Sequence, residues 1–105
     1  STVYNAGTSS DNAGIKLENT KNGKITNNNF SNNGRHGIYL WNDSDNNTIS
    51  GNIAINNDKR GIYLQDDCNN NTISGNTASN YMTSKQDEGI YLDGSDNNTV
   101  SKNCK

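Results

Sequence analysis

The chain has 105 residues, of which 28% are hydrophobic and 23 are Asn, and its formal net charge at pH 7 is −2. This length allows one small domain, and so few apolar side chains exclude a globule built around one large core. No apolar run approaches the roughly 18 residues of a membrane span, and the weak negative charge argues against a nucleic acid or an anionic membrane as the partner.

A repeat organises the sequence along most of its length. Each unit opens with Gly-Ile-Lys-Leu or Gly-Ile-Tyr-Leu, at residues 14, 37, 61 and 89. A second signature follows each opening at nearly constant distance, and its copies occupy 24–28 (KITNN), 48–52 (TISGN), 72–76 (TISGN) and 99–103 (TVSKN). Self-similarity at a period of this length is typical of a solenoid.

Both signatures predict short β-strands. Their apolar residues are two apart, or lie between polar neighbours, so one side of each strand is apolar. Asn, Gly and Asp between the signatures are typical of tight turns. One unit cannot bury its few apolar residues, whereas stacked units can, because strands of successive coils lie about 4.8 Å apart.

Stacking predicts columns of identical or similar residues along the coil. The inward columns are Ile15/Ile38/Ile62/Ile90, Leu17/Leu40/Leu64/Leu92 and Ile25/Ile49/Ile73/Val100, with a thinner third wall of Phe30/Ala54/Ala78. Two Asn columns are Asn28/Asn52/Asn76/Asn103 and Asn32/Asn56/Asn80. We interpret these as structural, since stacked Asn side chains hydrogen-bond along a column and Asn tolerates left-handed turns.

The predicted fold is therefore all-β, a right-handed single-stranded parallel β-helix of about four coils with no capping helix. Residues 1–105 form one domain in this interpretation, with coils that start near 14, 37, 61 and 89 and partial coils at both ends. Units of 22–28 residues with irregular loops suit the right-handed form.

The combination of GIYL with NNTISGN resembles the repeat of NosD-like and carbohydrate-binding or sugar-hydrolase surface proteins of the archaeal type. The resemblance covers residues 14–105 and implies a right-handed β-helix related to pectate-lyase-like enzymes and alginate epimerases. It also implies a location outside the cell or on the cell surface. The shared residues are inward or turn positions, so the resemblance concerns the fold more than an activity.

Function is expected on the outward side of the Gly-Ile-x-Leu strands. The candidate ligand-binding residues there are Tyr39, Trp41, Tyr63, Tyr91, Asp93, Glu18 and Gln65, beside Lys16. An exposed aromatic strip flanked by carboxylates suits the apolar faces and hydroxyl groups of sugar rings, so polysaccharide is the preferred ligand. The alternative is that the aromatic residues only stabilise the sheet through cross-strand pairs.

Two further functions remain open at this point. One is a structural subunit that binds copies of itself through open β-helix ends; writing Lys105 before Ser1 restores a coil only slightly longer than the longest internal one. The other is a fragment of a polysaccharide lyase, hydrolase or epimerase, in which His36, Tyr63, Arg60 and Asp66 would meet at one edge. The epimerase signature DPHE is absent, and no catalytic residue is assigned.

No cofactor and no metal ligand are assigned. The acidic turns at 42–47, 65–70 and 93–98 raise Ca²⁺ as an alternative, but neither an EF-hand loop nor a GGxGxD repeat is present and Asp/Asn turn chemistry explains most of their composition. Cys68 and Cys104 lie in different parts of the coil and are expected to be free thiols.

Overall fold

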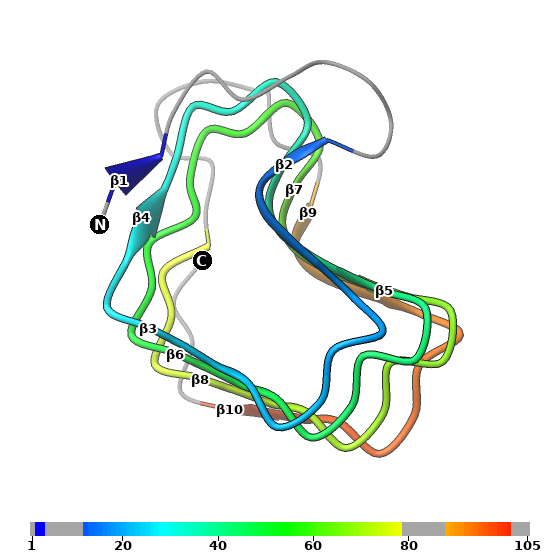
Figure 1. Cartoon of the computed structure of the whole chain (residues 1–105). Helices are drawn as coiled ribbons and strands as arrows, with labels where there is room; N and C mark the ends of the chain where they lie inside the picture. Colours follow the sequence, from blue (N-terminus) through cyan, green and yellow to red (C-terminus); the bar gives the residue numbers. More distant parts are fainter. Residues whose placement is uncertain (1, 4–11, 79–87, 102–105) are drawn as a thin grey trace.

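The computed structural model describes residues 2–3, 12–78 and 88–101, and every regular element in these residues is a β-strand (Figure 1). The strands are β1 (Thr2–Val3), β2 (Ala13–Glu18), β3 (Lys24–Thr26), β4 (Asn29–Phe30), β5 (His36–Trp41), β6 (Thr48–Ser50), β7 (Arg60–Gln65), β8 (Thr72–Ser74), β9 (Glu88–Asp93) and β10 (Thr99–Ser101). Across this part of the chain there is no helix long and apolar enough to cross a membrane.

The strands form three parallel walls around one axis. The Gly-Ile-x-Leu strands make a four-stranded sheet in the order β2-β5-β7-β9, and the second signatures make a four-stranded sheet in the order β3-β6-β8-β10. The third wall is thinner, with β1 paired to β4 and isolated bridges from Asn29 to Ile53 and from Ile53 to Thr77. Neighbouring strands of each sheet come from successive repeats, so the predicted parallel β-helix is confirmed (Figure 1).

The inward columns have the predicted register. Ile38 pairs with Ile15 and Ile62 in the first sheet, and Ile49 pairs with Ile25 and Ile73 in the second. Residues of the middle rungs are fully buried, together with the third-wall residues Phe30, Ala54 and Ala78. Burial falls at the edge rungs, where Val100 has the predicted register but a 46% exposed side chain.

The Asn28/Asn52/Asn76 column is a hydrogen-bonded ladder, as predicted. The backbone N–H of Asn28 donates to Oδ1 of Asn52, and the N–H of Asn52 donates to Oδ1 of Asn76, over 3.0 and 2.8 Å. The Asn52 side-chain amide donates in turn to the carbonyl of Ile25. Each buried Asn thus satisfies backbone groups at a corner where neither sheet continues. Asn103, the predicted fourth member, lies outside the described residues.

A second Asn ladder was missed by the sequence analysis. The N–H groups of Gly23, Asn47 and Asn71 donate to the Oδ1 atoms of Asn47, Asn71 and Asn98, respectively. Its residues follow Asn46 and Asn70 in the Asn-Asn-Thr turns, and there the first Asn adopts the left-handed conformation while the second enters the ladder. In each Asn-Asn pair, the first residue therefore turns the chain and the second accepts a backbone hydrogen bond.

Left-handed Asn residues turn the chain at many corners. Asn32 and Asn56 have φ values of 59° and 57°, as predicted for that column, whereas Asn80 lies outside the described residues.

The Gly of the Gly-Ile-x-Leu unit has a different role, which is to allow close approach of two backbones. A Cβ on Gly37 would lie 2.7 Å from the carbonyl oxygen of Gly61. Glycine is required there because successive backbones approach too closely for any side chain.

The ladder predicts that Asn52→Ala lowers the free energy of unfolding by about 2–3 kcal/mol, because the change leaves buried backbone groups of Asn28 and Ile25 without a partner. Urea unfolding followed by circular dichroism measures the effect. Thr72→Ala, at an exposed position of β8, is the matched control and should change stability little. Equal effects of the two substitutions would contradict a structural role for the ladder.

Candidate functional site

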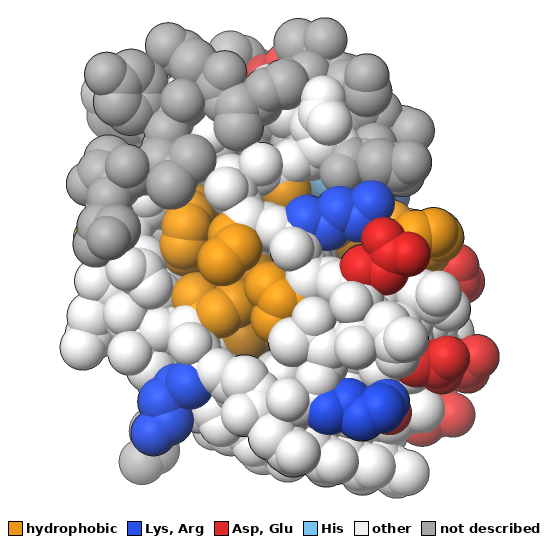
Figure 2. Space-filling view, viewed as in Figure 1, with side chains coloured by type: hydrophobic (Ala, Val, Ile, Leu, Met, Phe, Trp, Pro, Cys, Tyr) orange, Lys and Arg blue, Asp and Glu red, His pale blue; other side chains and the backbone are white. Residues whose placement is uncertain are grey.

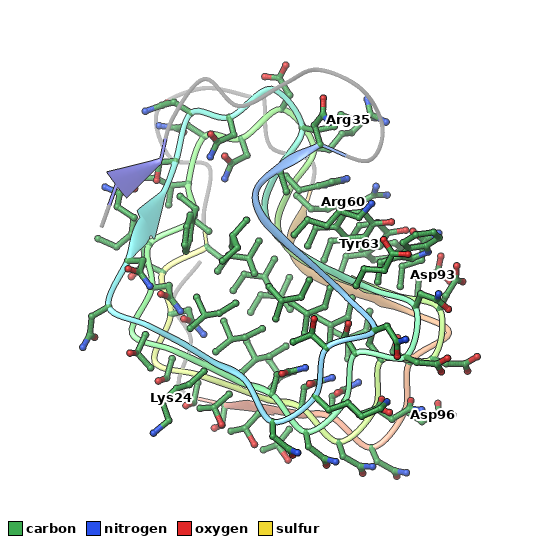
Figure 3. All side chains as sticks on the ribbon, in the orientation of Figure 1. Lys24, Arg35, Arg60, Tyr63, Asp93 and Asp96 are labelled. Carbon is green, nitrogen blue, oxygen red and sulfur yellow. The ribbon has the colours of Figure 1, made fainter. Side chains whose placement is uncertain are left out.

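The candidate site lies on the outward side of the sheet β2-β5-β7-β9. Strand register places Lys16, Tyr39, Tyr63 and Tyr91 in one column and Glu18, Trp41, Gln65 and Asp93 in the next. Both columns have the composition predicted from the sequence. Figure 3 shows Tyr63 and Asp93, with Arg60 beside them, pointing away from the interior of the coil.

The tyrosines do not form the exposed strip expected from the sequence. The rings of Tyr39 and Tyr63 are stacked with centroids 5.0 Å apart and an interplanar angle of 7°, and Tyr63 and Tyr91 follow at 5.3 Å and 21°. Tyr39 and Tyr63 are only 2% and 7% exposed, whereas Tyr91 is 36% exposed. The expectation was wrong for Tyr39 and Tyr63, because in-register parallel strands hold the rings face to face so that each covers its neighbour.

A third outward column completes the cluster and was not assigned to the binding site from the sequence. His36 and Arg60 are register partners in β5 and β7. The His36 ring is buried, with its centroid 5.1 Å from Tyr39 and 5.0 Å from Tyr63. The Arg60 guanidinium lies 4.6 Å from the ring centroids of both Tyr63 and Tyr91, so it covers the stack with a cation–π contact. The signal was the basic or His residue directly before Gly37 and Gly61.

The other side of the tyrosine column is also held in place. The Lys16 ammonium lies 4.7 Å from the Trp41 ring and 5.5 Å from Tyr39. The Trp41 indole N–H donates to Oδ2 of Asp66 over 3.0 Å, and the Tyr39 hydroxyl donates to Oε1 of Gln65. These outward side chains therefore contact one another in a polar and aromatic layer.

The residues considered for catalysis do come together in part. The Tyr63 ring contacts both the His36 ring and the Arg60 guanidinium, while Asp66 accepts a hydrogen bond from Trp41. Burial raises the pKa of the Tyr63 hydroxyl above its ordinary value of 10.0, and the nearby Arg60 charge opposes this only partly. A tyrosine that acts as a general base needs a pKa lowered toward neutral pH, so the arrangement does not favour Tyr63 in that role.

One carboxylate of the acidic turns, that of Asp45, makes structural contacts with the neighbouring rungs. Oδ1 of Asp45 accepts the backbone N–H of Asn69 and Oδ2 pairs with Lys21 at 2.9 Å, and these two contacts lower the pKa of Asp45 below its ordinary 3.8. Within residues 2–3, 12–78 and 88–101, no group of three or more His, Cys, Asp or Glu side chains is placed to hold a metal ion.

Cys68 is a buried free thiol, as expected, and Cys104 lies outside the described residues. The Cys68 thiol donates to the carbonyl of Gln65, and the N–H of Cys68 donates to Oγ of Ser95. In the neighbouring rung, the Ser44 hydroxyl donates to the carbonyl of Trp41 in the same way. Cys68 thus takes the place of a serine in a hydroxyl column, and burial raises the pKa of its thiol.

The burial of Tyr63 predicts that its phenol titrates at a higher pH than an exposed tyrosine does. Since the folded state disfavours the phenolate, Tyr63 contributes stability that is present below pH 10 and is lost as pH rises through its raised pKa. Subtracting the phenolate absorbance titration of Tyr63→Phe from that of the unsubstituted chain isolates this group. Its midpoint should lie above that of the urea-unfolded chain, and a midpoint at or below that reference would contradict the stacked, buried ring.

Comparison with known proteins gives one match. A family model described as right-handed beta helix region matches residues 1–105. The chain matches no curated protein and no solved structure.

Proposed function

Because this chain belongs to the right-handed β-helix family, we propose that it is a polysaccharide-binding module that uses the outward side of the sheet β2-β5-β7-β9, on a cell surface or outside the cell. The surface location follows from the resemblance of the repeat to surface proteins. The binding role is supported by the spacing and the chemistry of the outward columns.

The observation that carries the proposal is the spacing of the tyrosine column. Successive rings are 5.0 and 5.3 Å apart along the coil axis. One sugar residue of an extended β-1,4-linked chain advances by nearly the same length. A glycan that lies along the axis, across the strands, would therefore place one sugar residue beside each rung of the sheet.

The chemistry of the columns supports hydrogen bonding as the main contact. Tyr39 and Tyr63 are covered in the interior of the stack, so the polar groups presented outward are the Gln65 amide and the Asp93 carboxylate. Trp41 and Tyr91 are the aromatic residues with the larger exposed area. Carboxylates and amides bind sugar hydroxyl groups, while a partly exposed ring packs on the apolar side of a sugar.

Preorganisation adds to affinity. Lys16, Asp66 and Arg60 already contact Trp41 and the tyrosine stack in the absence of a ligand. Binding then costs little side-chain entropy, because the side chains are ordered before the ligand arrives. Glu18 and Lys16, at the edge rung, are exposed and extend the same surface.

The proposal predicts that Trp41→Ala weakens retention on a β-1,4-linked glucan matrix by about tenfold, the loss expected for one aromatic contact. Asp93→Asn should weaken it by a smaller factor, because an amide keeps one acceptor oxygen. Affinity electrophoresis with neutral and acidic β-1,4-linked glycans, and with an α-linked glucan as the geometric control, measures retention.

The matched control is Thr72→Ala, on the sheet β3-β6-β8-β10, which should bind as the unsubstituted chain does. Tyr63→Ala is a poor test because it removes the centre of the ring stack and so changes the fold and the surface together. Retention that is equal for the unsubstituted chain and Trp41→Ala, or absent for every glycan, would refute the proposal.

A further inference from the structure

The coil has two different open edges within the described residues. β2 and β3 form one edge of the two main sheets, and β9 and β10 form the other. Edge strands present backbone N–H and C=O groups suited to pairing with another strand. Core side chains are also incompletely covered there, namely Ile15 and Leu17 on one edge and Ile90, Leu92 and Val100 on the other. Figure 2 shows hydrophobic side chains gathered at the centre of the end formed by β2 and β3.

We propose that these edges bind each other, so that copies of this chain stack head to tail. In the joint, β9 and β10 of one copy pair in parallel with β2 and β3 of the next, and both sheets continue with their internal register. This proposal does not rest on glycan binding, although outward residues of the edge rungs, such as Tyr91 and Asp93, belong to the face proposed for the glycan.

The apolar columns continue through such a joint without a change of residue type. Ile90 of one copy lies over Ile15 of the next, as Ile62 lies over Ile90 within the chain. In the same way Leu92 meets Leu17, and Val100 meets Ile25. Val100, which is 46% exposed, becomes buried in the joint. Burial of this apolar area favours association.

Charge complementarity supports the head-to-tail direction. Hydrogen bonds from the N–H of Asn69 to Asp45 and from the N–H of Asp96 to Asn69 define one column that begins at Lys21 and ends at Asp96. Within the chain, Lys21 pairs with Asp45 on the rung below it at 2.9 Å. In the joint, Asp96 of one copy lies on the other side of Lys21 of the next, so the column ends carry opposite charges.

A hydroxyl column also continues. The N–H of Thr20 donates to Oγ of Ser44, and the N–H of Cys68 donates to Oγ of Ser95, so the two serines of this column each supply an acceptor to the rung above. Thr20 carries the hydroxyl that the N–H of Ser95 would meet in the joint. The Lys16 ammonium likewise meets Tyr91 of the neighbouring copy as it meets Tyr39 within the chain.

Two columns match less well. Asp93 and Glu18 would bring like charges together at an exposed position, where salt screens the repulsion. The Asn ladder that contains Asn98 ends at each joint, because Gly23 has no side-chain acceptor. The contact is therefore expected to be weaker than the rungs within the chain.

The joint is heterologous, so assembly does not close. A head-to-tail contact between different edges leaves one free edge of each kind on every oligomer, and growth continues with concentration. A tail-to-tail contact would instead pair β9 and β10 with their own copies in antiparallel orientation and would end at a dimer. The size distribution thus distinguishes the two arrangements.

Sedimentation velocity of the 105-residue chain over a range of concentrations, with negative-stain microscopy, tests the proposal. Oligomer length should increase continuously with protein concentration, and Asp96→Lys should weaken association by about tenfold because an ion pair is replaced by repulsion. Thr72→Lys is the matched control: it adds a positive charge to the lateral face, in the column that already contains Lys24, and should assemble as the unsubstituted chain does.

Val100→Lys provides a second variant, since it places a charge in the joint at a position that is already exposed in the isolated chain. Far-ultraviolet circular dichroism establishes that each variant is folded, and a folded Val100→Lys should remain monomeric. The proposal would be overturned by a monomer at every concentration, by a distribution that stops at a dimer, or by equal assembly of Asp96→Lys and Thr72→Lys.

Discussion

In-register stacking is the constraint on which the rest of this structure depends. In the described strands of the middle rungs, each residue lies directly between its counterparts from the neighbouring repeats, so each position must suit a whole column of similar residues. Ile and Leu meet this condition by packing, and Asn meets it because its side chain accepts an N–H from the preceding rung and donates to a carbonyl of that rung, as Asn52 does with Asn28 and Ile25. The chain can therefore be rich in Asn and still bury a continuous core.

The same constraint determines the character of the lateral surface. Aromatic rings in one column cover each other, and the basic residues beside them lie over the stack, as Arg60 does for Tyr63 and Tyr91. The side chains that reach solvent, among them Trp41, Gln65, Tyr91 and Asp93, are spaced by the rungs of the coil. This regular spacing is the reason for proposing a ligand with its own linear repeat.

The fold could be predicted from the sequence because the repeat period determines which residues of successive strands pair. Once Ile38 is aligned with Ile62, the residues on either side of them are aligned as well. Exposure could not be predicted in this way. Alternation places Tyr39 and Tyr63 outward, but their burial comes from each other and from His36 and Arg60, whose long or planar side chains reach across columns. The Asn47/Asn71 ladder was missed because its residues look like ordinary turn residues until the corner geometry is known.

The most direct test of stacking is hydrogen exchange of the Asn side-chain amides, followed by NMR. The account predicts slow exchange for the Nδ2 protons of Asn52, Asn71 and Asn76, which are buried and bonded to carbonyls of the preceding coil, and fast exchange for the exposed Asn42, Asn46 and Asn70. Equally fast exchange in both sets would show that the ladders do not form, and would contradict the in-register coil.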